Sequence, residues 1–336
     1  MGEDILVISN LNYRHKIRKP QWNNPWKNTI GHGLTNVSFN VKSGQIIGLV
    51  GPNGAGKTTL LEIIAGLHVP EEGRVTISGN DSTTVMSRGF VGFMPENVNW
   101  NGKSTPRKCL QRLSVMRGCE DTVDELLKSV GLVERADNSL DTLSLGMKQR
   151  LSLAASLMGM PELLLLDEPL NGLDPVAQEA LKNLLLNLSK TGKSVIISSH
   201  FLSELERFVD HIIVLNKGSL VIEGTIKDIE NELNLGGKLV IEGIKSKEIE
   251  IEKSISELDF VREIEYNVEN NDNEWQLNLR HLKGKWGIGQ REKIVEKLVS
   301  NNCTPNTIQL LNSNLSQILT SVTNVKKIDM KIQEEE

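Results

Sequence analysis

The chain has 336 residues, more than one hydrophobic core usually organises, so we expect a large domain followed by a small one. Its net charge of -5 argues against a sequence-independent grip on nucleic-acid phosphates, and no nucleic-acid partner is expected. The sequence has no apolar run of about 18 residues, no signal-peptide pattern at Met1, and three cysteines without the spacing of a disulfide framework or a zinc site.

Three short strands are predicted near the N-terminus, at residues 4–9, 35–42 and 45–50. Between the first two, residues 15–33 follow neither a strand period nor a helix period, and we predict a loop insertion there. That segment contains two prolines and two tryptophans, Pro20, Pro25, Trp22 and Trp26.

The middle of the chain alternates short apolar strands with helices, which predicts an α/β core with a parallel sheet. The expected strands are residues 73–78, 89–94, 163–166 and 195–198. Helical patterns cover residues 57–67 and 105–130, and a further helix begins at Asp174 and Pro175 and ends at Gly192.

After about residue 230 the composition becomes charged and rich in asparagine. Residues 231–325 fit the order β-α-β-β-α-β-α, which predicts a small ferredoxin-like α+β domain ending in a helix at 315–322. Residues 326–336 form a charged tail. The large N-terminal domain is therefore expected to span residues 1–230.

A phosphate-binding loop follows the strand that ends at Val50. The segment from Gly51 to Thr58 fits G-x-x-x-x-G-K-[ST] and precedes a helix, so backbone N–H groups and the helix N-terminus can surround a phosphate. Lys57 is expected on the β- and γ-phosphates and Thr58 on Mg²⁺, which makes ATP and Mg²⁺ the predicted cofactors. The nucleotide-binding residues predicted here are Asn53, Gly54, Ala55, Gly56, Lys57, Thr58 and Thr59.

Two carboxylates, Asp167 and Glu168, follow the apolar strand at residues 163–166. Ligands collect where parallel strands end, so Asp167 is expected to hold Mg²⁺ and Glu168 to polarise the attacking water. Adjacent acids after a strand are often only capping residues, but the phosphate loop favours the catalytic role.

The segment Leu143-Ser144-Leu145-Gly146-Met147-Lys148-Gln149-Arg150 resembles the LSGGQ-type signature of ABC ATPases. The resemblance covers about residues 5–225 and implies a RecA-like P-loop core, an antiparallel β-subdomain and a helical subdomain at about residues 97–160. It also implies that Ser144 and Gly146 contact ATP bound to a second cassette, in a homo- or heterodimer with two shared sites.

Two further motifs of that family have counterparts here. Asn171-Gly172-Leu173-Asp174 resembles the D-loop at the dimer interface, although Asp174 before Pro175 is also a plain helix cap. His200 matches the switch histidine that contacts the γ-phosphate. The resemblance thus implies Glu168 and His200 as catalytic residues and Asp174 as a nucleotide-site residue.

Glu96 and Met147 depart from the common family pattern, which has glutamine at both positions. Glu96 can still ligate Mg²⁺ or a water molecule, but it adds negative charge beside the γ-phosphate. Both variants resemble cassettes of the ABC-2 drug and peptide exporter group.

Adenine in this family stacks on an aromatic ring near the first strand. Tyr13 is the favoured candidate by position, and Trp22 and Trp26 in the insertion are alternatives, unless those tryptophans belong to a surface loop.

The resemblance implies an ATPase that drives export of a drug, peptide, lipid or ion through separate membrane-spanning permease subunits, at the cytoplasmic face of the membrane. The closing segment at residues 312–321 resembles the ending of such exporters. Residues 97–118, with Trp100, form the expected docking surface for the permease, unless they are an ordinary amphipathic helix. The alternatives are a soluble cassette acting on ribosomes or DNA, and an import ATPase.

Overall fold

The computed structural model describes residues 3–18, 28–119, 123–200, 202–206, 208–232, 238–244, 255, 257–268, 274–281, 288–300 and 304–311. The chain divides into two compact units, Met1–Glu223 and Gly224–Glu336. Helix α8 (Ile226–Glu232) belongs to the second unit, and the predicted boundary at residue 230 falls inside this helix.

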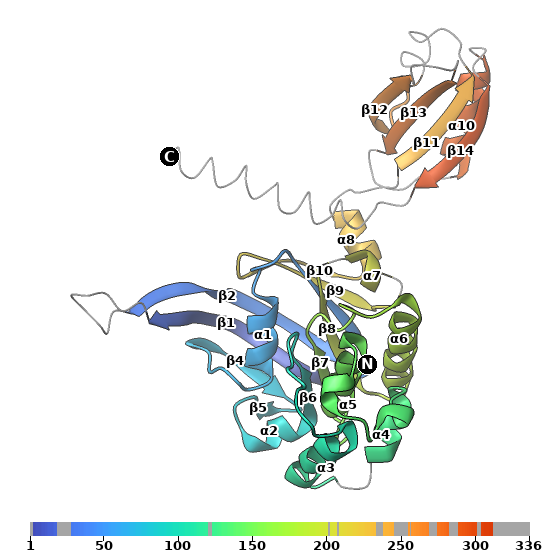
Figure 1. Ribbon diagram of the computed structural model, residues 1–336. Helices are drawn as coiled ribbons and strands as arrows, with labels where there is room; N and C mark the ends of the chain where they lie inside the picture. Colours follow the sequence, from blue (N-terminus) through green and yellow to red (C-terminus); the bar gives the residue numbers. More distant parts are fainter. Residues whose placement is uncertain are drawn as a thin grey trace, which may run out of the picture. The chain divides into compact units, whose positions relative to one another are not determined.

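The first unit is built on a sheet of six strands in the order β10-β9-β3-β8-β7-β6 (Figure 1). These strands are β3 Ile46–Val50, β6 Val91–Met94, β7 Leu163–Leu166, β8 Ser194–Ser199, β9 His211–Asn216 and β10 Ser219–Gly224. From β9 through β3, β8 and β7 to β6, neighbouring strands run parallel. The three central strands β3, β7 and β8 are buried along their whole length, as expected of a sheet covered on both faces.

A second, antiparallel sheet has the order β2-β1-β4-β5, with β1 Asp4–Arg18, β2 Asn28–Lys42, β4 Glu72–Ile77 and β5 Asn80–Asp81. Helix α1 (Lys57–Ile64) shares one hydrophobic core with both sheets, in which Leu60 and Ile63 lie with Leu6 of β1 and Leu49 of β3. Because α1 begins at the phosphate loop, this core fixes the loop against the ends of the parallel strands.

The predicted loop insertion at residues 15–33 is wrong at both of its ends. Strand β1 continues to Arg18 and β2 begins at Asn28, with Lys16 paired to Ile30 and Arg18 to Asn28. An antiparallel ladder satisfies backbone groups whatever the side-chain pattern, so a missing hydrophobic period does not exclude a strand. Trp22 and Trp26 fall outside the described residues.

The helices cover the parallel sheet and build the helical region, where α3, α4 and α5 contact one another (Figure 1). Their bounds are α2 Val85–Phe90, α3 Pro106–Arg117, α4 Val123–Ser129, α5 Leu145–Ser156, α6 Pro175–Lys190 and α7 Leu202–Leu205, with 3-10 turns at Val133–Arg135 and Leu140–Thr142. The single helical stretch predicted at residues 105–130 is wrong, because Gly118 adopts φ +64° and ends α3.

The second unit contains a four-stranded sheet in the order β12-β13-β11-β14, whose neighbours all pair antiparallel. The strands are β11 Lys238–Ile244, β12 Val261–Val268, β13 Glu274–His281 and β14 Pro305–Leu311, and α10 spans Ile288–Ser300. Ile294 and Leu298 of α10 pack with Leu239, Ile241 and Leu277 of the sheet. Of the helix predicted at residues 254–258 only Ile255 is described as helical, and the predicted helix at 315–322 and the tail at 326–336 lie outside the described residues.

Candidate functional site

The phosphate loop connects β3 to α1 and borders a cavity of about 490 Å³. Gly54 and Gly56 adopt φ +79° and +103°, a region that glycine enters without a Cβ clash. This conformation lets the loop wrap around the cavity beside the N-terminus of α1, where an anion is favoured. Most predicted nucleotide residues line the cavity: Asn53, Gly54, Ala55, Gly56, Lys57, Thr58, Thr59, Glu96, Glu168 and His200.

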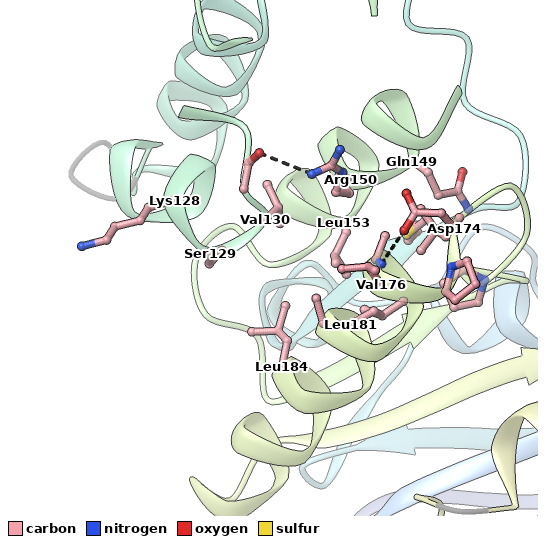
Figure 2. Close-up of a pocket in the computed structure, with 17 residues that line it drawn as sticks. Lys128, Ser129, Val130, Gln149, Arg150, Leu153, Asp174, Val176, Leu181 and Leu184 are labelled. Carbon is pink, nitrogen blue, oxygen red and sulfur yellow. Dashed lines mark hydrogen bonds between the residues drawn. The ribbon is translucent and has the colours of Figure 1, made fainter. Parts of the chain in front are cut away.

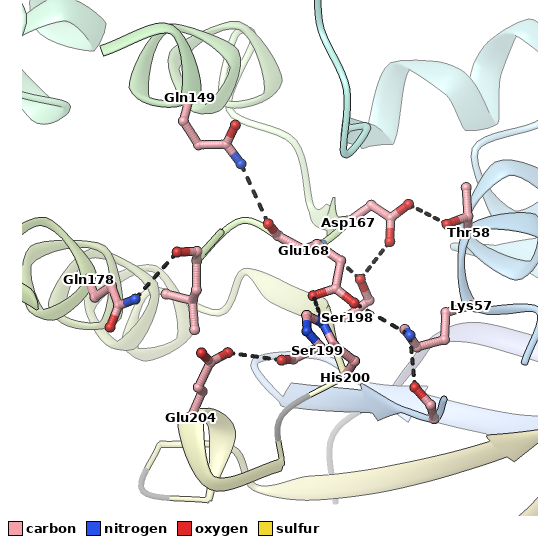
Figure 3. Close-up of polar contacts among 12 residues, drawn as sticks. Lys57, Thr58, Gln149, Asp167, Glu168, Gln178, Ser198, Ser199, His200 and Glu204 are labelled. Atoms are coloured by element: carbon pink, nitrogen blue, oxygen red, sulfur yellow. Dashed lines mark hydrogen bonds and ion pairs between the residues drawn. The ribbon is translucent and has the colours of Figure 1, made fainter. Parts of the chain in front are cut away.

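The two predicted carboxylates meet the phosphate loop at the carboxyl edge of β7 (Figure 3). Thr58 Oγ1 donates to Asp167 Oδ2 at 2.7 Å, and Lys57 Nζ lies 3.4 Å from Glu168 Oε1. Lys57 also donates to the carbonyl of Gly51 at 2.8 Å. The lysine is 7% exposed and Glu168 is 7% exposed, so this ion pair is largely shielded from water.

His200 follows β8 and is the third polar side chain of this group. Its Nδ1 lies 2.9 Å from Glu168 Oε2, so the carboxylate lies between the ring of His200 and the ammonium of Lys57. Glu168 adopts φ +48°, a strained conformation for a residue with a side chain, and such strain often marks a functional site. The structure thereby brings Lys57, Glu168 and His200 together as the sequence predicted.

The oxygen atoms at this edge fit Mg²⁺. In nucleotide sites Mg²⁺ takes one or two protein oxygens and completes its shell with phosphate and water. Thr58 and Glu96 line the cavity, and the Thr58 hydroxyl donates to the carboxylate of Asp167, which is 0% exposed and lies directly behind Thr58 without lining the cavity itself. Among the described residues no group of three or more His, Cys, Asp or Glu side chains could hold a metal by itself. When bound, Mg²⁺ would neutralise phosphate charge.

Tyr13 does not line the cavity, whereas His15 and His32 do. The rings of Tyr13, His15 and His68 form a cluster, with centroid distances of 5.0 Å from Tyr13 to His15, 5.2 Å from Tyr13 to His68 and 5.9 Å from His15 to His68. Burial, Glu62 and Glu71 raise the pKa of Tyr13, which keeps its phenol neutral. His15 Nε2 lies 3.1 Å from Thr59 Oγ1, at the phosphate loop.

The sequence contained a signal for His15 that the prediction did not use. His15 follows Tyr13 by only two residues, so it lies close in sequence to the position favoured for the stacking ring. An imidazole is a planar aromatic ring and can cover a base as a phenol can. The prediction considered only Tyr13 and the tryptophans.

Ser144, Gly146 and Asp174 are absent from the residues that line this cavity. Ser144 caps α5, its Oγ accepting from Met147 N at 3.3 Å, and Gly146 lies against Gly172. Asp174 caps α6, accepting from Ala177 N at 2.8 Å. The structure therefore does not bring these three residues to the phosphate loop of their own chain.

Asp174 instead lines a second cavity, of about 670 Å³, between α6 and the helical region (Figure 2). Leu153, Leu181 and Leu184 give it an apolar wall, and Arg150 donates to the carbonyl of Gly131 at 3.4 Å on its border. None of the phosphate-loop residues lines it, so the larger cavity is not the nucleotide site.

Comparison with known proteins places this geometry in a family. A family model described as ABC transporter matches residues 34–171. The chain is 34% identical over 223 residues to the linearmycin resistance ATP-binding protein LnrL of Bacillus subtilis (strain 168), an alignment that covers 64% of this chain and 70% of that protein. This chain belongs to the ABC transporter ATP-binding family.

Other relatives agree with this assignment. The lantibiotic transport ATP-binding protein SrtF of Streptococcus pyogenes is 34% identical over 198 residues, covering 59% of this chain and 86% of that protein. The solved dimeric structure of the ATP-binding cassette MJ0796 in a post-hydrolysis state, bound to ADP and Pi, has a TM-score of 0.57 and 26% identity and covers 66% of this chain and 98% of that chain. The predicted P-loop ABC fold, the ATPase activity and the likeness to the drug and peptide exporter group are confirmed.

The cavity of this ABC ATPase brings together groups of different chemistry. An ammonium such as that of Lys57, together with backbone N–H groups, can bind phosphate, and a carboxylate such as that of Glu168 can accept a proton from water. His200 bonds to the same carboxylate, which orients Glu168.

Within the part of the chain that the structure describes, none of the helices has the length and apolar character needed to span a membrane.

Proposed function

We propose that this ABC ATPase drives export of a drug, peptide, lipid or ion through separate membrane-spanning subunits, at the cytoplasmic face of the membrane. The support comes from the relatives, which are named for linearmycin resistance and for lantibiotic transport. These names favour an antimicrobial compound as the cargo class. In this proposal ATP is bound with Mg²⁺ at the cavity of Lys57 and Thr58.

We propose further that the working unit is a cassette dimer with two shared ATP sites. The observation that carries this proposal is the separation of the signature residues Ser144 and Gly146 from the cavity of their own chain. Two large apolar side chains beside them face solvent, Leu145 at 68% and Val176 at 80% exposure. A second cassette placed on this surface would cover them and would bring its own Ser144 and Gly146 to the cavity, in addition to the phosphate contacts that Lys57 and His200 of the first chain provide.

The docking surface proposed for the permease, residues 97–118, needs a different central residue from Trp100. The indole Nε1 of Trp100 donates to Ser152 Oγ at 2.7 Å, so this ring ties the loop to α5. Val115 and Met116 of α3 are 63% and 82% exposed and can meet a partner directly. We therefore assign the contact to the α3 surface formed by Val115 and Met116.

Adenine is proposed to stack on His15. His15 lines the cavity, and its ring is held from one side by Tyr13, with an interplanar angle of 87°. Tyr13 thus supports the stacking ring instead of covering the base itself.

Affinity purification of the full chain from gently solubilised membranes, followed by mass spectrometry, tests the proposed function. A co-purifying protein with several membrane spans is expected. Recovery of ribosomal or chromosomal proteins without a membrane protein would contradict export and would favour a soluble cassette. Co-purification with a solute-binding protein would favour an importer.

A further inference from the structure

Ser198 occupies a position beside both acidic residues of the site. It lies near the carboxyl end of β8, with β3 on one side and β7 on the other, and pairs in register with Leu49 of β3. The residue is 1% exposed, so its hydroxyl depends on protein partners for hydrogen bonding. Figure 3 shows those partners to be Asp167 and Glu168.

The Ser198 hydroxyl both donates and accepts. Its Oγ donates to Asp167 Oδ1 at 2.6 Å and accepts from the backbone N of Glu168 at 2.8 Å. The first bond is as short as expected of a hydroxyl donating to a carboxylate, a strong class of hydrogen bond. One hydroxyl therefore fixes the side chain of Asp167 and the backbone of Glu168.

The carboxylate of Asp167 is held at both oxygens. Thr58 donates to Oδ2 at 2.7 Å, and Ser198 donates to Oδ1. Asp167 is 0% exposed, so no bulk water can replace either donor. If the Thr58 hydroxyl turns toward Mg²⁺, Ser198 becomes the side chain that keeps the carboxylate in place.

The Ser198 hydroxyl also restrains the backbone of Glu168. This residue adopts φ +48°, which is unfavourable unless its surroundings hold it. The hydrogen bond from Glu168 N to Ser198 Oγ helps to stabilise this backbone conformation, in which the Glu168 carboxylate contacts Lys57 and His200. A change at Ser198 would thus disturb the metal ligand and the base together.

We infer that Ser198 is a positioning residue that holds Asp167 in the orientation needed for Mg²⁺ and fixes the direction of Glu168. Residues that bond to a metal ligand orient it, and removing them typically lowers metal affinity or activity about 10- to 100-fold. The inference rests on Mg²⁺–ATP as the ligand of the proposed function.

Ser194, near the other end of β8, provides a matched control. It is also buried, at 0% exposure, and its Oγ also has two bonds, from Gly44 N at 3.0 Å and to Lys42 O at 3.3 Å. Those partners do not line the nucleotide cavity. Ser194→Ala therefore removes a comparable buried hydroxyl from the same strand without touching the acids.

The test measures binding of a fluorescent ATP analogue to the full-length protein, first with EDTA and then during Mg²⁺ titration. In EDTA, the affinity of Ser198→Ala for the analogue is expected to lie within about twofold of the wild-type affinity. The Mg²⁺ midpoint, which is the Mg²⁺ concentration that gives half of the metal-dependent gain in affinity, is expected to rise about tenfold. At saturating Mg²⁺ and ATP, kcat is expected to fall about 10- to 100-fold. Ser198→Thr keeps the hydroxyl, and its Mg²⁺ midpoint and kcat should stay near the wild-type values.

A wild-type Mg²⁺ midpoint in Ser198→Ala would overturn the inference, as would an equal shift in Ser194→Ala. A lower melting temperature with an unchanged midpoint would show a structural role only. If Ser198→Ala does not fold, Ser198→Cys replaces it, because a thiol is a weaker donor, and an unshifted midpoint there overturns the inference. Absence of Mg²⁺-dependent binding in the wild type would instead count against the proposed nucleotide function.

Discussion

Glu168 Oε2 and His200 Nδ1 lie 2.9 Å apart, at the carboxyl ends of two neighbouring strands. The glutamate comes after β7 and the histidine after β8, and Lys57 approaches the other carboxylate oxygen from the phosphate loop. The residues proposed for phosphate binding and for proton transfer, Lys57 and Glu168, therefore belong to one cluster of side chains. Changes within this cluster should separate binding from turnover.

Replacing Glu168 with Gln should abolish turnover while ATP binding persists. An amide keeps the shape of the side chain but cannot accept the proton of the attacking water, and general-base catalysis typically contributes about 10²- to 10⁴-fold to the rate. We expect kcat to fall by at least about 10²-fold and ATP to trap a dimer, measured by phosphate release and by size-exclusion chromatography with ATP. Equal turnover in wild type and variant would remove Glu168 from this role.

Replacing His15 with Ala should weaken ATP binding more than a change at Tyr13. Stacking of a base on an aromatic ring is worth about 1–3 kcal/mol, which corresponds to about a 5- to 150-fold rise in Kd. Tyr13→Phe keeps the supporting ring beside His15 and is expected to leave Kd within about twofold. Isothermal titration calorimetry on both variants measures the two Kd values. A larger rise in Kd for Tyr13→Phe than for His15→Ala would indicate that adenine stacks on Tyr13.

Replacing Met116 with Glu should uncouple the ATPase from the permease. The side chain is 82% exposed, so the substitution should leave the fold and the intrinsic ATPase rate intact while a charge blocks an apolar contact. We expect permease-stimulated hydrolysis in reconstituted membranes to fall at least about fivefold, because losing an interface side chain often costs about 1 kcal/mol or more. Val133→Glu changes another exposed apolar residue, outside residues 97–118, and should keep stimulation. Full stimulation of the Met116 variant would exclude this surface.

Asp174 should reveal two separable roles. Its carboxylate caps α6 by accepting from Ala177 N at 2.8 Å, and loss of an N-cap typically costs about 1 kcal/mol of unfolding free energy. Asp174→Ala is therefore expected to lower stability by about that amount, measured by chemical denaturation, whereas Asp174→Asn retains a good cap and should not. If ATP-induced dimerisation is impaired in Asp174→Asn, whose cap is intact, the residue also acts at the dimer interface. Equal unfolding free energies of the wild type and both variants would contradict the capping role.

Local patterns in the sequence determined much of the fold and most of the nucleotide site. The phosphate loop, the strand before Asp167 and the strand before His200 were predictable because each motif is contiguous and each lies at the end of an apolar strand. Parallel strands bring such ends to one edge of a sheet, which places Lys57, Glu168 and His200 at the same edge, and the order β3-β8-β7 makes them neighbours there.

The tertiary structure decided which further side chains reach the site. Neither His15 nor Ser198 belongs to a motif: the pairing of β1 with its neighbours brings His15 to the cavity, and the place of β8 between β3 and β7 brings Ser198 to Asp167 and Glu168. Trp100 likewise proved to be anchored by Ser152, a residue of another helix. Contacts of this kind join segments distant in sequence, and the geometry of a hydrogen bond between them is set by packing rather than by any local pattern of residues.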